Sequence, residues 1–201
     1  MPEARHTGLV NDRTPPPPCR YPLPDLDELP ADIRERIEAV AERSGFVPNV
    51  FLALARRPAE FRAFFAYHDA LMERDDGLTK AEREMVVVAT SALNDCAYCV
   101  VAHGAILRVR AKDPLLADRV AVNWRHAPLS LREEAILDLA TKVAERPGAV
   151  VEEDLQEALG AGLSEEEVWD VVAITAFFAL SNRLASPFRI QPNPEFFTLG
   201  R

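Results

Sequence analysis

The chain has 201 residues, of which 48% are hydrophobic and 27% are charged, the composition of one ordinary globular domain rather than of a disordered chain. A chain of this length can bury a sizeable core without help from disulfides. The net charge of -9 argues against binding to a nucleic-acid backbone, which requires clustered Lys and Arg. We therefore expect a protein with no nucleic-acid partner.

The sequence shows no sign of export or membrane insertion. Met1 to Val10 lacks the apolar run of a secretory signal, and the longest apolar run, Val171 to Leu180, is roughly half the length of a membrane span. We interpret that run as a buried core helix. Three cysteines without an export signal favour catalytic or metal-binding thiols over a disulfide framework. We expect a cytoplasmic protein with no membrane partner.

Residues 1–30 form a Pro-rich N-terminal arm, which includes four consecutive prolines from Pro15 to Pro18. Proline fixes φ and removes an amide donor, so this arm is predicted to be extended or irregular. It is either a disordered leader or an arm packed across the body or a neighbouring subunit. Leu23, Leu26 and Leu29 favour docking of its second half.

Residues 31–201 are predicted to form one helical domain. Ile33, Ile37 and Val40, for example, follow the spacing of four and three that places apolar residues on one helix face. No segment shows sustained strand alternation, so the fold class is all-α. The expected helices span 31–43, 49–55, 58–74, 79–94, 96–110, 114–122, 130–145, 151–160 and 164–184.

Three of these helices begin with a capping box, in which a hydroxyl and a carboxylate three residues apart exchange hydrogen bonds with backbone amides. The three matches are 79–82, 130–133 and 164–167, and a leucine precedes each of them. Because each match opens an apolar-periodic run, the three helix starts are well supported.

The segment that carries chemistry contains Cys96, Cys99 and His103, whose spacings of three and four place them on one face of one helix. Asn94 or Asp95 is the expected N-cap, which would put Cys96 in the first turn. The field at a helix N-terminus stabilises a thiolate, the nucleophilic form of cysteine. A histidine one turn beyond Cys99 can take its proton.

Glu84 lies in the preceding helix, which is joined to the cysteine helix by almost no loop. Its carboxylate could therefore approach the thiol face and orient or polarise His103. Two alternatives remain for these residues: a pair of buried structural thiols, or a zinc site with Glu84 or another group as fourth ligand. Cys19, in the arm, is interpreted as a bystander, and His68 as a structural histidine.

At this point the residues resemble those of the AhpD-like superfamily, which includes the carboxymuconolactone decarboxylases. Glu84, the Cys96-x-x-Cys99 pair and His103 match its spacing. Residues 45–51 and 182–183 resemble the branch of peroxidase-related enzymes, and the resemblance covers about residues 30–195.

The resemblance implies an AhpD-like helical fold, with the catalytic helix pair at 79–110, that assembles as trimers or dimers of trimers. It also implies reduction of hydroperoxides without a bound cofactor. Cys99 would attack the peroxide and become a sulfenic acid, and Cys96 would then close a disulfide with it. Glu84 and His103 would form the proton relay. An external dithiol, from a donor protein or a lipoyl-type carrier, would restore both thiols.

One position departs from the family pattern, because Tyr98 stands where the best-studied members have a second histidine. A tyrosine can donate a hydrogen bond but cannot act as a base near neutral pH, so the relay is expected to be shorter and the rate lower. The helix field favours Cys96 as the attacking thiol, whereas the nearness of His103 favours Cys99. Lactone decarboxylation and redox sensing without turnover are the alternative functions.

Overall fold

The computed structural model describes residues 15–201, and in this part of the chain it is all-α, as predicted, with nine α-helices and no strand. Every expected helix is present, and its ends differ from the prediction by at most two residues. The helices are α1 (Ala31–Ser44), α2 (Asn49–Ala55), α3 (Pro58–Met72), α4 (Lys80–Leu93), α5 (Ala97–Ala111), α6 (Leu116–Asn123), α7 (Leu131–Glu145), α8 (Glu152–Gly160) and α9 (Glu165–Ala185).

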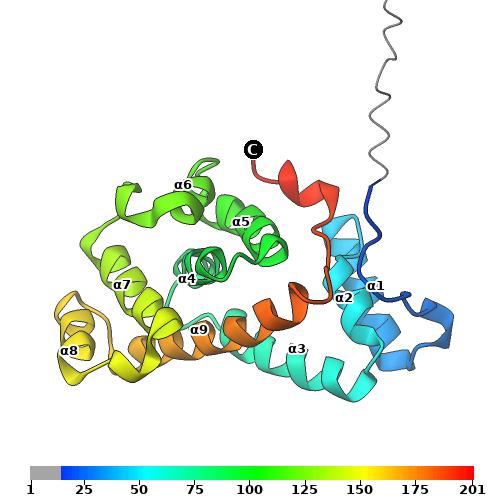
Figure 1. Cartoon of the computed structure of the whole chain (residues 1–201), viewed down its shortest axis with the longest axis horizontal. Coiled ribbons are helices and arrows are strands. Elements are labelled where there is room, and N and C mark those ends of the chain that lie inside the picture. The colour runs from blue at the N-terminus through cyan, green and yellow to red at the C-terminus, as the bar shows by residue number, and fades with distance from the viewer. Residues whose placement is uncertain (1–14) are drawn as a thin grey trace, which may run out of the picture.

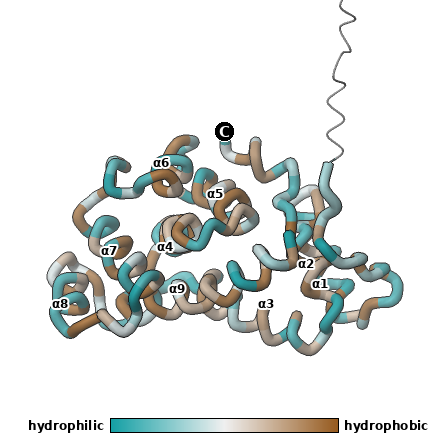
Figure 2. The backbone as a smooth tube through the Cα atoms, in the orientation of Figure 1, coloured by the Kyte–Doolittle hydropathy of each residue, from teal (hydrophilic) through white to brown (hydrophobic). Residues whose placement is uncertain are grey.

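Helix α4 is the central element of the fold, and α5, α6, α7 and α9 surround it (Figure 1). Its residues from Glu82 to Ser91 are all buried, because the helix is enclosed on every side. The hydropathy of the backbone follows this arrangement, with hydrophobic segments in the central helices and hydrophilic ones on the outer turns (Figure 2). The helix that carries Glu84 is therefore held rigidly from several directions.

The three predicted capping boxes are all formed. Thr79, Ser130 and Ser164 each accept a hydrogen bond from the backbone amide three residues later, and the carboxylate at that position accepts one from the N-cap amide. These reciprocal bonds satisfy amides that would otherwise lack partners at the helix starts. The starts of α4, α7 and α9 were therefore predictable from four-residue patterns.

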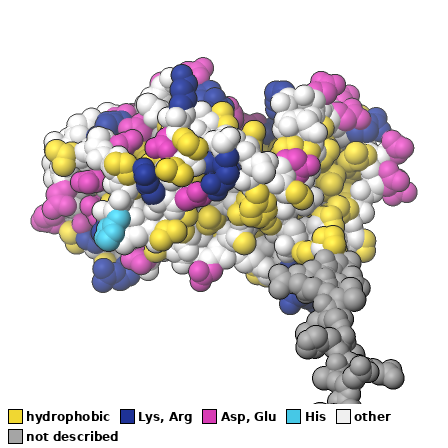
Figure 3. Space-filling model, turned by 90° about the horizontal axis from the view of Figure 1, so that it is seen from above, with side chains coloured by type: hydrophobic (Ala, Val, Ile, Leu, Met, Phe, Trp, Pro, Cys, Tyr) yellow, Lys and Arg dark blue, Asp and Glu magenta, His cyan; other side chains and the backbone are white. Residues whose placement is uncertain are grey.

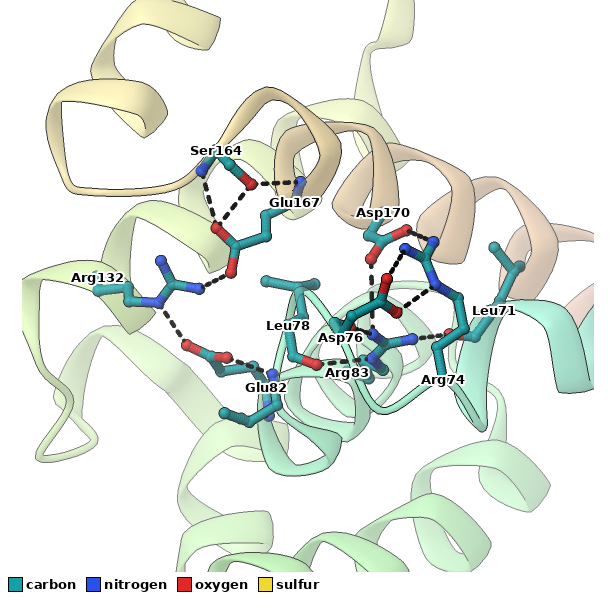
Figure 4. A network of polar contacts seen from close by, with 11 residues as sticks. Leu71, Arg74, Asp76, Leu78, Glu82, Arg83, Arg132, Ser164, Glu167 and Asp170 are labelled. Carbon is teal, nitrogen blue, oxygen red and sulfur yellow. Dashed lines mark hydrogen bonds and ion pairs between the residues drawn. The ribbon is translucent and has the colours of Figure 1, made fainter.

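A buried polar network joins the start of α4 to α7 and α9 (Figure 4). Arg83 is fully buried and donates to the backbone carbonyls of Leu71, Asp76 and Leu78. Its guanidinium also lies 3.7 Å from a carboxylate oxygen of Asp170 in α9. A buried charge of this kind requires several partners, and here they fix the loop between α3 and α4 against α9.

Helix α9 is 21 residues long and is apolar enough to cross a membrane by length and composition, but 61% of its most apolar window is buried inside the fold. It contacts α3, α4, α5, α7 and α8. This confirms the prediction that the run from Val171 to Leu180 lies in a core helix.

The second half of the N-terminal arm packs on the body of the same chain. Arg20 donates to the carbonyl of Phe188, and Gln191 donates to the carbonyl of Pro18, both at 2.8 Å. Cys19 and Leu29 are buried. Residues 1–14 of the arm lie outside the described residues, so the choice between a disordered leader and a packed arm is not tested there. Of the two alternatives, the structure supports docking for residues 18–29.

Candidate active site

The turn between α4 and α5 is short because Asp95 adopts a left-handed conformation, with φ of 50°. Its amide donates to the carbonyl of Ala92, and the Cys96 amide donates to the carbonyl of Ser91. Helix α5 then begins at Ala97, so Cys96 is the N-cap. This corrects the prediction of Asn94 or Asp95 as N-cap: Cys96 precedes the helix, and Cys99 occupies the first turn.

Glu84 and His103 meet across this helical hairpin. Glu84 lies ten residues before Asn94 and His103 lies nine residues after it, so antiparallel packing brings them to the same level. The Nδ1 atom of His103 and a carboxylate oxygen of Glu84 are 2.8 Å apart. The ring also packs edge-to-face on Phe178, with centroids 4.7 Å apart. The carboxylate thus fixes Nδ1–H as the donor and leaves Nε2 available as a base.

Both sulfurs of the Cys96–Cys99 pair are free thiols that are 1% exposed. Their surroundings come from the C-terminal part of α9. Ser181 Oγ lies 3.7 Å from Cys99 Sγ. Within the described part of the chain, no hydrogen bond joins either sulfur to His103. The sequence spacing predicted that the two cysteines and His103 share one face of α5. In the structure His103 contacts Glu84 in α4, whereas Cys99 contacts Ser181 in α9.

The two thiols differ in acidity. The pKa of Cys96 is lowered to about 6, chiefly by a hydrogen bond from the Cys99 thiol. The Cys99 amide, Ser186 and Asn182 lower it further, while burial opposes the shift. The pKa of Cys99 lies well above its usual range, because it donates to the Cys96 sulfur and is itself buried. The pair titrates as a unit, and its first proton leaves a negative charge on Cys96.

The Tyr98 hydroxyl makes its hydrogen bond away from Glu84 and His103. This hydroxyl accepts a hydrogen bond of 3.4 Å from the amide of Val50 at the start of α2, and the tyrosine ring packs edge-on against Phe196. Burial raises the pKa of the phenol, so Tyr98 remains a neutral group that ties α2 to α5.

A cavity of about 200 Å³ opens beside the pair, between residues 95–98 and residues 185–191. Cys96 lines it, and Cys99 is not among its lining residues. A volume of this size can hold a small organic molecule together with water. Cys96 is therefore the member of the pair that borders this cavity.

The zinc alternative requires three or four ligands at one point. Among residues 15–201, no group of three or more His, Cys, Asp or Glu side chains is arranged to hold a metal ion. The four candidate ligands instead form two adjacent pairs. Cys96 and Cys99 make one pair of thiols, and Glu84 and His103 make the other through a hydrogen bond.

Comparisons with known proteins identify the family. Residues 58–114, which hold Glu84, both cysteines and His103, match the model of the carboxymuconolactone decarboxylase family. The structure described as the alkylhydroperoxidase AhpD core of a peroxidase-related protein from Ralstonia eutropha JMP134 is 58% identical. The match covers 93% of this chain and 98% of that one, with a TM-score of 0.92. The chain belongs to the AhpD-like group of this family.

Two further structures share the AhpD-like fold. A peroxidase-related protein from Silicibacter sp. TM1040 is 36% identical, with 96% of this chain and 100% of that chain covered and a TM-score of 0.88. The debrominase Bmp8, solved with 2,3,4-tribromopyrrole, is 18% identical, with 88% and 92% covered and a TM-score of 0.74, and shows the fold alone. No curated protein sequence matched the chain.

Sequence reasoning missed the contribution of α9 to the site of this AhpD-like protein. Ser181, Asn182 and Ser186 lie more than 80 residues beyond the cysteines, and no spacing rule connects them. Asn182 belonged to the match of residues 182–183 with the peroxidase-related branch, but nothing in the sequence placed it beside the thiols. Cys19, interpreted as a bystander, is buried in the same apolar cluster as the pair.

Proposed function

We propose that this AhpD-like protein is a thiol peroxidase that reduces hydroperoxides with Cys96 and Cys99, using Glu84 and His103 as a proton relay. The single observation that carries the proposal is the acidic, reduced thiol pair, held one turn from a histidine that is fixed by a carboxylate. A thiolate at neutral pH, a base and an orienting acid are the groups that nucleophilic thiol chemistry requires.

The cycle has three steps. A thiolate attacks the peroxide, so that an S–O bond forms, the O–O bond breaks, and the alcohol leaves after it takes up a proton. The sulfenic acid then condenses with the second thiol to give a disulfide and water. An external dithiol finally exchanges with this disulfide, returning both thiols and becoming a disulfide itself. The cycle needs no bound cofactor.

We propose that Cys99 is the attacking sulfur, as the family resemblance implies, and that Cys96 serves as its base. The resting charge on Cys96 can accept the proton of the neighbouring Cys99 thiol as that thiol attacks. The leaving alkoxide takes its proton from solvent through His103, one turn beyond Cys99: Nε2 first accepts that proton and then donates it to the alkoxide oxygen. The acidity of Cys96 and its place in the cavity wall support the opposite order, so the assignment must be tested directly.

The function is tested by measuring consumption of tert-butyl hydroperoxide with dihydrolipoamide as the dithiol. We expect multiple turnovers for the wild type, none for Cys99→Ser, and a rate reduced about 10²–10⁴-fold in Glu84→Gln or His103→Gln, the typical loss of a proton relay. Cys19→Ala is the matched thiol control and should keep its turnover. Unchanged turnover in Cys99→Ser would refute the proposal.

The order of attack is tested with a sulfenic-acid probe and peptide mass spectrometry after one equivalent of peroxide. A probe adduct on Cys99 in the Cys96→Ser variant supports the proposed order, and it should form more slowly than the wild type loses its thiols, because the Cys96 base is absent. An adduct on Cys96 in Cys99→Ser, formed as fast as the wild type loses its thiols, would reverse the order. If the wild type instead forms the Cys96–Cys99 disulfide reversibly but turns over slowly or not at all, the protein is a redox sensor rather than a peroxidase.

We further propose that the dithiol partner is a donor protein or a lipoyl-type carrier and that the protein acts in the cytoplasm. We also propose that the chain assembles as a trimer or a dimer of trimers. Hydrophobic side chains gather in patches between charged ones on the face in Figure 3. Large apolar side chains are exposed on α3 and α9, among them Tyr67, Trp169 and Leu180. Such surfaces are typical of contacts between subunits. Light scattering coupled to size-exclusion chromatography measures the assembly.

A further inference from the structure

A buried asparagine lies between α4 and the thiol pair, near the end of an otherwise apolar helix. Asn182 is 2% exposed and belongs to α9, next to Ser181. A buried amide is costly unless its donors and acceptor are all satisfied. Its hydrogen bonds must therefore be accounted for one by one.

The orientation of the Asn182 amide is fixed by its neighbours. Asn94 Nδ2 donates to the carbonyl of Thr90 at 3.1 Å and to Asn182 Oδ1 at 3.0 Å, and Asn182 Nδ2 donates to Ser91 Oγ at 3.0 Å. Because Thr90 can only accept there, Asn94 must present its nitrogen. Turning the Asn182 amide over would set two donors against each other, so its nitrogen faces Ser91 and the site.

One hydrogen of the Asn182 amide remains after the bond to Ser91. Ser91 also holds the backbone of Cys96, because the Ser91 carbonyl accepts a hydrogen bond of 3.0 Å from the Cys96 amide. Ser181, beside Asn182, contacts the Cys99 sulfur. Asn182 therefore lies between a residue that binds the Cys96 backbone and a residue that contacts the Cys99 sulfur, and its side chain lowers the pKa of both thiols.

We propose that Asn182 is the shared hydrogen-bond donor that stabilises the thiolate of the pair on whichever sulfur carries it. The negative charge moves between Cys96 and Cys99 during attack and disulfide exchange, while the donor stays in place. This is a role in the thiol chemistry itself, and it rests on the proposed function. Asn94 and Ser91 are the positioning residues that hold the amide.

The test measures alkylation by iodoacetamide at a series of pH values, with peptide mass spectrometry to follow each cysteine separately. In Asn182→Leu we expect the midpoint for Cys96 to rise by about one to two pH units, the effect of losing a hydrogen bond to a charge. The isosteric Asn182→Asp should raise it further, because its carboxylate also repels the thiolate. At pH 6 this lowers the alkylation rate several-fold. Circular dichroism verifies that each variant is folded.

Thr175→Val is the matched control, because it removes another buried hydrogen bond of α9, from the Thr175 hydroxyl to the Val171 carbonyl, that does not involve Asn182. We expect it to lower the melting temperature without moving the Cys96 midpoint. A midpoint within about 0.3 units of the wild type in both Asn182 variants would overturn the proposal. The measurement uses no peroxide, so absent turnover in the wild type would refute the peroxidase function separately.

Discussion

Replacing Arg83 with methionine is expected to destabilise the protein far more than the loss of a surface charge. The Arg83 side chain is fully buried, and each of its nitrogens serves a partner: three backbone carbonyls and the Asp170 carboxylate. Methionine fills a similar volume but provides no donor. Arg83→Met therefore leaves buried acceptors unpaired, which is the costly way to break an ion pair.

The magnitude follows from those contacts. Losing one partner of a buried pair costs about 3–5 kcal/mol. In the variant, Asp170 still pairs with Arg74 at 3.2 Å, so the negative charge of Asp170 stays partly compensated. We therefore expect the free energy of unfolding to fall by about 4 kcal/mol. For a chain of this length, that lowers Tm by roughly 8–16 °C. Arg83→Lys keeps the charge without the planar fork and should fall between methionine and the wild type.

The assay is equilibrium unfolding in urea, followed by circular dichroism at one fixed protomer concentration. Arg132→Met is the comparison in the same network: its side chain is 29% exposed, unlike that of Arg83, but its partners Glu82 and Glu167 are mostly buried, so we expect a smaller loss of about 2 kcal/mol. If the Arg83 and Arg132 variants lose the same free energy within about 0.5 kcal/mol, burial does not amplify this interaction and the reasoning is wrong.

Three further predictions concern acidity and backbone conformation. Alkylation of Cys96 should show a midpoint near pH 6, and in Cys99→Ala the midpoint should rise, because the Cys99 thiol is the largest cause of the low pKa; an unmoved midpoint contradicts this. Burial raises the pKa of the Asp170 carboxyl group above 3.8. The folded state therefore binds the carboxyl proton more tightly than the unfolded state does. The free energy of unfolding should then fall as pH rises from 3.8 through the raised pKa, and urea titrations should find that this component is absent in Asp170→Asn. Gly77 has φ of 70°, and an added Cβ would lie 3.0 Å from a carboxylate oxygen of Asp170, so Gly77→Ala should lower stability by about 1–2 kcal/mol. Gly148→Ala meets no atom within 4 Å and should be neutral; equal melting temperatures for the two alanine variants would refute the strain argument.

The sequence by itself determined the helices and the chemical identity of the site. Apolar spacing and the three capping boxes are local signals, so they predicted each element to within two residues. The thiol pair, His103 and Glu84 lie within one hairpin of 20 residues, from 84 to 103, where helical geometry and a short turn restrict their positions. The resemblance of these residues to the AhpD-like superfamily agreed with the comparisons.

Tertiary structure decided the surroundings of the thiols. Asp95 in a left-handed conformation moved the helix start to Ala97, a one-residue difference that no propensity rule resolves. The acidity of Cys96 depends on how its sulfur meets Cys99, Ser186 and Asn182, and two of these groups come from distant sequence. Long-range contacts of this kind arise from the packing of α9 against the α4–α5 hairpin, and local sequence does not encode which polar side chain will face a sulfur.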